Sequence, residues 1–420
     1  MGTLFKIAWR NVWRHWKRTV ITLITMTFGL GLFISIDSML RGMDAAGLDS
    51  IVNLSDSALR ISTKEYEKER RAVPLDYGLS NIQAIEARLK EDKRVVEVAP
   101  RTHFIGELSL DLDSIPVMAV AVDPILDEKV FTLTKNMQGD WLNGKKDENG
   151  FSRIVLGYKL ARDLGVGLGD TITLFARTRY EAQNADDFVV SGLLDTDDPN
   201  INFNGVYLAF SDAEEFLDLE GLRTELTVRM EKRVNLQDAM ADSDELAAAI
   251  AQEFPSLEAL SFGEVGRSFL ELAKMKKMFT NVMVFIILLI AGVGIANTLL
   301  MSVYSRIREI GVLRAFGLKP RQIRTLFIME GSIIGTLGSL SGMAFGIFLD
   351  YLLIFKGYPI GAMYGDINIG IPIGDVLYGE WNPAMVLAAG IIGIIIALIA
   401  SYSPSNRAAK MEVTDALRFV

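Results

Sequence analysis

The stretch RIREIGVLRAFGLKPRQIRTLFIMEG, residues 306–331, is a basic segment between two strongly apolar runs. From Arg306 to Phe316 apolar residues recur at roughly helical spacing, which predicts a short helix. Gly317 and Pro320 predict a turn after it, because proline cannot continue the hydrogen-bond ladder of a helix and restricts the residue before it. A second helix is expected after this proline. Two helices that meet at a membrane face would leave an apolar stripe between arginines, which suits the docking of a cytoplasmic partner.

A basic loop between two spans can also serve only to fix membrane topology. The order of residues favours a more specific role. The pattern R-x-x-E-I-G-V-L-R-A-F-G resembles the signature of the FtsX-like, MacB-type family of ABC transporter permeases, which includes the lipoprotein-releasing LolC and LolE type. The resemblance implies that this segment is the coupling helix, which sits in a groove of a separate ATPase. The residues assigned to coupling are Arg306, Glu309, Gly311, Leu313, Arg314, Ala315, Phe316 and Gly317.

Composition divides the chain into a membrane part and a polar part. Of the 420 residues 50% are hydrophobic and 23% are charged, and residues 42–277 carry 27 basic and 43 acidic side chains. A large acidic domain is therefore joined to a basic membrane part. The absence of cysteine excludes disulfides and thiolate metal sites, and two histidines make a histidine metal or catalytic site improbable. We expect no catalytic residues, no metal and no cofactor bound by this chain.

The first 18 residues predict an interfacial amphipathic helix that lies flat on the cytoplasmic leaflet. One face carries Phe5, Trp9, Val12, Trp13 and Trp16, and the other carries Lys6, Arg10, Arg14 and Lys17. Tryptophan prefers the headgroup level of a bilayer, and lysine and arginine prefer the neighbourhood of anionic lipid. A basic arm that binds nucleic acid is the weaker alternative, because tryptophans share the stripe and a membrane span follows.

Four apolar runs, residues 19–41, 278–303, 325–350 and 383–403, are each long enough to cross about 30 Å of hydrocarbon. The charged residues 269–277 lead into the second run without a break, so one continuous helix is expected to form a stalk there. The third run carries glycines at a spacing that lets helix backbones approach closely, although lipid-facing glycine would look the same. The residues assigned to helix packing are Gly331, Gly335, Gly338, Gly342 and Gly346.

Residues 42–277 predict an α+β domain inserted between the first two spans. Alternating β-forming segments and short helices suggest an αβ subdomain made of residues 42–125 and 223–270, which carries a β-rich subdomain of residues 126–222. This division resembles the extracytoplasmic domain of the same permease family. The glycines of GVGLGD, residues 165–170, fit a turn better than a phosphate loop, and no Walker A sequence is present. A calcium site among the aspartates of residues 195–198 is a weaker alternative to solvated loop charge.

Lysine and arginine counts predict the topology. Residues 1–18 carry five and residues 304–324 carry six, whereas the loop 351–382 carries only Lys356. The positive-inside rule then places both termini, the coupling segment 304–324 and the tail 404–420 in the cytoplasm. The loop 351–382 and the large domain lie outside, since long domains cross regardless of their charge.

The fold class expected is therefore an α-helical membrane protein with four transmembrane helices plus a large α+β extracytoplasmic domain inserted between helices 1 and 2. The resemblance implies a permease subunit in the bacterial inner membrane that transmits ATPase motion to this domain. It implies two permease protomers, identical or paralogous, on a cytoplasmic ABC ATPase dimer that holds ATP and magnesium. An insert of about 235 residues without a fused ATPase looks most like the LolC and LolE type, which release lipoproteins, with a periplasmic carrier as a possible further partner. MacB-type export of small molecules or peptides and FtsX-like regulation of an envelope hydrolase remain alternatives.

A subunit that lifts a lipoprotein out of the outer leaflet needs apolar surface where the first two spans leave the membrane. Flexible methionine and phenylalanine suit irregular lipid tails, although ordinary helix packing explains the same residues. The candidate lipid or substrate contacts are Phe33, Ile36, Met39, Leu40, Met43, Met275, Met278, Phe279 and Val282.

Overall fold

The computed structural model describes residues 2–14, 16–110, 113–233, 236–360 and 376–411. The chain divides into two compact units. The helical unit comprises residues 1–44, 273–358 and 377–420, and the sheet unit comprises residues 45–272 and 359–376.

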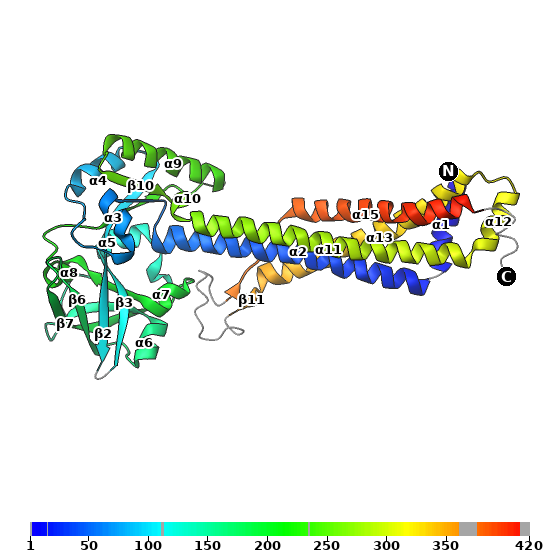
Figure 1. Cartoon of the computed structure of the whole chain (residues 1–420). Helices are drawn as coiled ribbons and strands as arrows, with labels where there is room; N and C mark the ends of the chain where they lie inside the picture. The colour runs from blue at the N-terminus through cyan, green and yellow to red at the C-terminus, as the bar shows by residue number, and fades with distance from the viewer. Residues whose placement is uncertain (1, 15, 111–112, 234–235, 361–375, 412–420) are drawn as a thin grey trace. The chain divides into compact units, whose positions relative to one another are not determined.

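Four helices in the described residues are long and apolar enough to cross a membrane, which confirms the four predicted spans. They are α2 (Trp16–Ser50), α11 (Arg267–Ser305), α13 (Pro320–Phe355) and α15 (Pro383–Lys410) (Figure 1). The prediction that residues 269–303 form one unbroken helix is confirmed by α11.

The expected single helix over residues 4–18 is instead two helices. The first, α1, spans Gly2–Arg14, and Trp16 already belongs to α2. The hydroxyl of Thr19 donates a 2.8 Å hydrogen bond to the carbonyl of Val12, and this bond is buried. Because the last carbonyls of a helix have no partner within it, Thr19 stabilises the end of α1. The amphipathic segment therefore ends at Arg14.

The basic segment folds as predicted. Helix α12 spans Ile307–Ala315, and Gly317 follows with a φ of +92°. A residue with a side chain would be strained at this φ. Pro320 occupies the first position of α13, where its missing N–H costs nothing. Helix, turn and second helix lie where the glycine and the proline predicted them.

Two predicted boundaries are wrong at the other ends of the helices. The outer loop was expected from residue 351, but α13 continues to Phe355, because no breaker precedes Gly357 with its φ of +69°. The tail was expected from residue 404, but α15 runs through Pro404 to Lys410. Ala408 packs against α12 and α13 there, and this contact holds the last turns helical despite the proline. Within the predicted outer loop and tail, residues 361–375 and 412–420 lie outside the described residues.

The glycines of α13 serve two different neighbours. A Cβ placed on Gly338, Gly342 or Gly346 would meet Met26, Leu30 or Ile34 of α2, in that order, at 2.6 to 2.8 Å. Gly331 and Gly335 lie instead against Ser401 and Ala397 of α15. The first three glycines, which we call the glycine seam, therefore let α13 and α2 of the same chain approach closely.

Replacing Gly342 with leucine should destabilise the helical unit. The nearest atom to a Cβ at this position is the Cβ of Leu30 at 2.8 Å, and overpacking of this kind costs about 1–3 kcal/mol. Thermal unfolding of the detergent-solubilised chain measures the effect. Gly294→Leu is the matched control, because nothing lies within 4 Å of a Cβ there. Equal stability of the two variants would contradict the packing described for the seam.

The sheet unit is built on one sheet whose strand order is β10-β1-β9-β2-β3-β8-β5-β7-β4, with β6 paired to β2 and β7. The strands are β1 (Leu59–Thr63), β2 (Val95–Leu110), β3 (Asp113–Val122), β4 (Gln138–Gly139), β5 (Ser152–Gly157), β6 (Thr171–Arg177), β7 (Gln183–Leu194), β8 (Gly205–Ala209), β9 (Glu225–Met230) and β10 (Leu257–Ser261). A further short pair, β11 (Tyr358–Pro359) and β12 (Val376–Leu377), flanks residues 361–375.

Short helices complete the sheet unit (Figure 1). They are α3 (Lys64–Glu69), α4 (Ile82–Lys90), α5 (Pro124–Val130), α6 (Tyr158–Leu164), α7 (Pro199–Asn204), α8 (Phe210–Phe216), α9 (Leu236–Glu253) and α10 (Phe262–Val265). A π-helical turn, Ile51–Ser55, follows α2, and 3-10 turns span Arg70–Ala72 and Leu133–Asn136.

The two expected subdomains are not separate in the sheet unit, because β2 and β3 contribute to both of them. Near its start, Val98 of β2 packs with β1, β9, β10, α4 and α9. Farther along, Phe104 and Leu108 pack with β5, β6, β7 and β8. Strand β3 likewise pairs with β8 over Met118–Val122. Strands β2 and β3 fall within residues 42–125, which were assigned to the αβ subdomain. Because β2 is 16 residues long, it reaches into the β-rich part and supplies side chains to its core as well.

Candidate functional site

The site begins with a buried ion pair under α12. Arg306, which precedes the helix, is 4% exposed, and its Nη1 donates to Oε1 of Glu330 in α13 at 2.9 Å. The same carboxylate oxygen accepts a 2.7 Å hydrogen bond from the amide of Asn11 in α1. Three helical elements therefore meet at one carboxylate. Charges are buried in this way only when they are paired and hydrogen-bonded.

A second carboxylate connects α12 to α1 nearer the surface. Glu309 accepts from Nε of Arg306 at 3.0 Å and from Arg14 at 2.6 Å. Partial burial raises the pKa of Glu309, but the hydrogen bonds from the two arginines outweigh burial and hold this pKa below its ordinary value. Glu309 therefore stays ionised at neutral pH and joins the two helices.

The inner face of α12 packs on the helical unit. Ile307, Ile310 and Gly311 are buried, and Leu313 packs beside Ile310 against Ile323 of α13. Arg314 donates to the carbonyl of Met411. Of the residues assigned to coupling, Arg306, Gly311 and Leu313 therefore support the helix from within. Leu313 is half-buried, so only part of its side chain is open to a partner.

The outer face of α12 is open. Arg308, Val312, Ala315 and Phe316 lie three to four residues apart, so they share one side of the helix, and all four are exposed. Phe316 is 83% exposed, the largest fraction among the exposed large apolar side chains. Gly317 beside it is exposed as well. Arg308 and Val312 were not among the residues assigned to coupling, although their spacing from Phe316 identifies them as neighbours on the helix.

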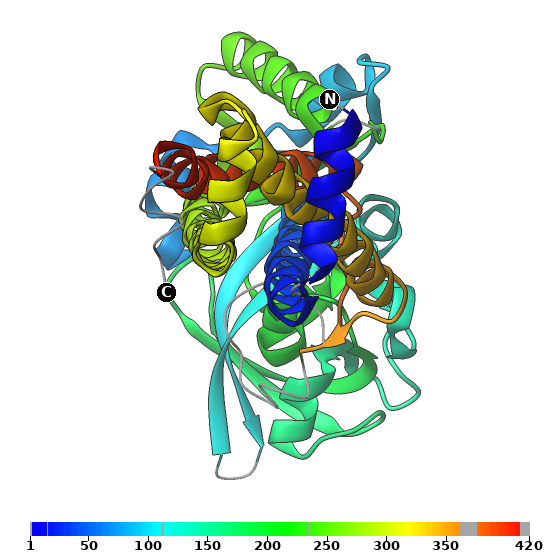
Figure 2. The ribbon, with the colours of Figure 1, turned by 90° about the vertical axis from the view of Figure 1, so that its right-hand side faces the viewer.

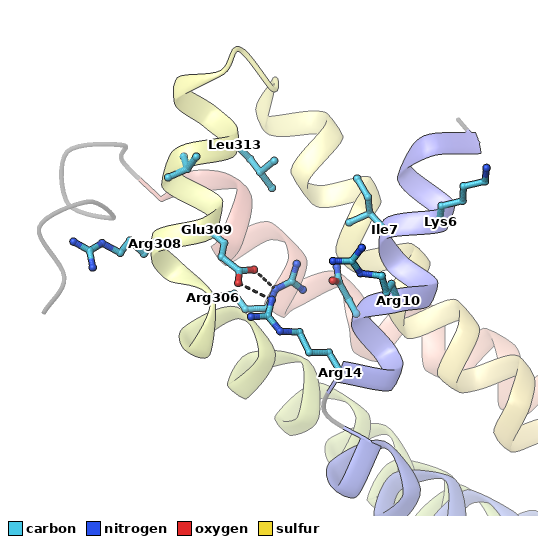
Figure 3. Close-up of a pocket in the computed structure, with 10 residues that line it drawn as sticks. Lys6, Ile7, Arg10, Arg14, Arg306, Arg308, Glu309 and Leu313 are labelled. Carbon is cyan, nitrogen blue, oxygen red and sulfur yellow. Dashed lines mark hydrogen bonds and ion pairs between the residues drawn. The ribbon is translucent and has the colours of Figure 1, made fainter.

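A groove of about 830 Å³ runs between α1 and α12, which both lie at one end of the helical unit with the start of α13 between them (Figures 1 and 2). Figure 3 shows the basic side chains that line it. The lining residues are Lys6, Ile7, Arg10, Asn11, Arg14, Arg306, Arg308, Glu309, Val312 and Leu313. We call this the basic groove.

The candidate lipid contacts divide into two groups. Phe33 is 4% exposed and packs in the core of the helical unit with Leu288 and Ala291, so its assignment to lipid contact is wrong. Met39, Leu40 and Met43 are half-buried, and Ile36 is 43% exposed. The four candidates on α11 are the most open, with exposed fractions of 54–72%: Met275, Met278, Phe279 and Val282.

Known families match most of the chain. Residues 19–246 match the MacB-like periplasmic core domain, and residues 281–413 match the C-terminal domain of FtsX-like permeases. The chain is 25% identical over 340 residues to the lipoprotein-releasing system transmembrane protein LolC of Xylella fastidiosa, which covers 78% of this chain and 79% of that protein.

Two further relatives align over almost the whole chain. LolE of Haemophilus influenzae, a transmembrane protein of the lipoprotein-releasing system, is 22% identical and covers 99% of both chains. The macrolide export ATP-binding/permease protein MacB of Nitrosomonas europaea is also 22% identical, and the match covers 98% of this chain but 58% of that protein.

Within the described residues, four helices able to cross a membrane and a sheet-rich unit, together with these matches, define an ABC transporter permease. The chain belongs to the FtsX-like, MacB-type permease family, and the resemblance found in residues 306–317 is confirmed. Members of this family work with ATPase partners.

Proposed function

We propose that this chain is the permease subunit of an ABC transporter that releases lipoproteins from the outer leaflet of the bacterial inner membrane. The ATPase is a separate subunit that holds ATP and magnesium, and it docks on the outer face of α12. In this proposal both termini lie in the cytoplasm, the sheet unit lies in the periplasm, and a second permease protomer completes the complex.

The open face of α12 is the observation that carries the docking step. Phe316 is 83% exposed at the tip of a helix whose other face is fixed by buried contacts. A large aromatic side chain exposed beside a helix that is itself fixed in place is typical of residues that anchor protein interfaces. Rigid support also suits the transmission of force, because the Arg306 and Glu330 pair ties α12 to α13.

Two observations favour a lipoprotein over other substrates. The chain matches LolE over almost the full length of both proteins, whereas it matches only 58% of MacB, and α11 exposes apolar side chains. The LolE match covers 99% of both chains. Met275, Met278 and Phe279 expose flexible apolar side chains of the kind that fit irregular acyl chains. Extraction of acyl chains costs about 0.8 kcal/mol per exposed methylene, which explains a need for ATP.

Photo-crosslinking tests the substrate. A crosslinker at Met278, in the nucleotide-free complex with its ATPase, should capture an acylated lipoprotein and lose it when ATP is added. The control position is Ile399 of α15, which is 69% exposed and should capture membrane lipid without responding to ATP. Capture of a soluble peptide or a drug at Met278, with no lipoprotein in any state, would overturn the proposal in favour of MacB-type export.

A further inference from the structure

The basic groove holds more positive charge than the chain itself neutralises. Arg306 is fully engaged by Glu309 and Glu330, and Arg14 is paired with Glu309. Three further cations line the groove: Lys6, Arg10 and Arg308. Among the described parts of the chain, no carboxylate forms a salt bridge with any of the three. An anionic group from outside would therefore find unpaired donors here.

Helix α1 has three faces that define where this groove lies. Ala8 and Val12, at 0% and 4% exposure, pack on Leu326 and Ile334 of α13. The second face is an exposed aromatic stripe of Phe5, Trp9 and Trp13, which are 44–51% exposed. The third is basic and lines the groove: Lys6, Arg10 and Arg14.

Each aromatic residue of α1 is followed directly by a cation. Phe5 precedes Lys6, Trp9 precedes Arg10, and Trp13 precedes Arg14. Successive helical residues are rotated by about 100°, so the basic face runs beside the aromatic stripe along the whole helix. Because exposed tryptophans settle at the headgroup level of a bilayer, the cations of α1 lie at the depth of the lipid phosphates.

We propose that the basic groove binds the phosphate headgroup of an anionic phospholipid. The cations for the phosphate come from α1, because the guanidinium of Arg308 points away from α1 (Figure 3). Ile7 and Leu313 add apolar surface to the same groove, which fits the glycerol and upper acyl chains of an amphiphile. An acidic protein segment would use the cations but would gain little from this apolar lining or from the neighbouring aromatic stripe. The bound lipid would join α1 to α12 and so stabilise the helix on which the ATPase docks.

Native mass spectrometry of the full-length chain tests this site. The probes are phosphatidylglycerol and phosphatidylcholine with identical acyl chains, and the measurement is the ratio of the two lipids retained. Each cation near an anionic surface contributes about fivefold, so Lys6→Gln combined with Arg10→Gln should lower the preference for phosphatidylglycerol about twenty-fivefold. Both side chains are exposed, so their removal should leave the fold intact.

The matched control is Lys17→Gln combined with Arg321→Gln, which removes two exposed cations that do not line the groove. This control should keep the preference of the wild-type chain. An equal loss in both double variants would mean diffuse electrostatics and would overturn the site. Unchanged lipid preference in Lys6→Gln with Arg10→Gln, together with weaker retention of the ATPase, would assign the groove to an acidic protein segment instead. Displacement of the lipid by millimolar inorganic phosphate would point to a free anion and would also contradict the proposal.

Discussion

Replacing Phe316 with alanine should detach the ATPase from this permease while leaving the helices folded. An exposed aromatic anchor at the centre of an interface contributes about 2–4 kcal/mol, so the amount of ATPase that co-purifies should fall by at least about tenfold. Because Phe316 is 83% exposed, its truncation removes almost no contact within the chain. The measurement is the stoichiometry of the purified complex together with its rate of ATP hydrolysis.

A suitable control is Phe355→Ala, since Phe355 is 70% exposed at the opposite end of α13. This variant should retain the ATPase in full. Wild-type stoichiometry and stimulated hydrolysis in Phe316→Ala would show that α12 is not the docking helix. Leu313→Asp is a poorer test, because Leu313 packs against Ile323 and a charge there would also disturb the fold.

The second large effect is expected at the buried ion pair. Arg306→Ala leaves the carboxylate of Glu330, whose side chain is 3% exposed, without a counter-charge. Removal of one partner from a buried pair costs about 3–5 kcal/mol, so the unfolding midpoint of the solubilised chain should fall sharply. Coupling to the ATPase should weaken as well, since α12 loses its tie to α13.

Two comparisons separate the loss of the pair from the loss of a side chain. Arg306→Met combined with Glu330→Leu removes both charges and should recover most of the stability, because apolar replacements of a buried pair are often neutral. Arg14→Ala breaks only the more exposed contact with Glu309 and should cost less than about 1 kcal/mol. If Arg14→Ala proved as harmful as Arg306→Ala, the buried pair would not be the main support of α12.

Local signals explain what the sequence could predict. Gly317 and Pro320 stop one helix and start the next through their own backbone chemistry, so α12 and α13 could be placed from neighbouring residues alone. The four spans follow from apolar runs whose length matches a bilayer. The family resemblance at residues 306–317 was confirmed as well, because the pattern of residue types there is specific.

Contacts between distant residues explain what the sequence could not predict. Arg306 was assigned to docking, but the structure shows it buried against Glu330, which lies 24 residues away. Asn11, which binds the same glutamate, lies 319 residues from it, so the sequence could not reveal that these side chains meet. The carboxylate of Glu330 within an apolar helix indicates that a partner must neutralise it, but the sequence does not show which residue that partner is. The tail was expected from residue 404, but α15 continues through Pro404, and Ala408 packs on α12 and α13 beyond it.

The glycine seam has a consequence for how this protein is made. Met26, Leu30 and Ile34 each contact a glycine that lies 312 residues later in the sequence. At a synthesis rate of about 5–20 residues per second, α2 is complete roughly 15–60 s before its partner helix leaves the ribosome. During this interval the early helix presents methionine, leucine and isoleucine to the lipid, which tolerates all three. The late helix brings the bare backbone of the glycines, and the hydroxyls of Thr27 and Ser341 hydrogen-bond to each other when the two helices join.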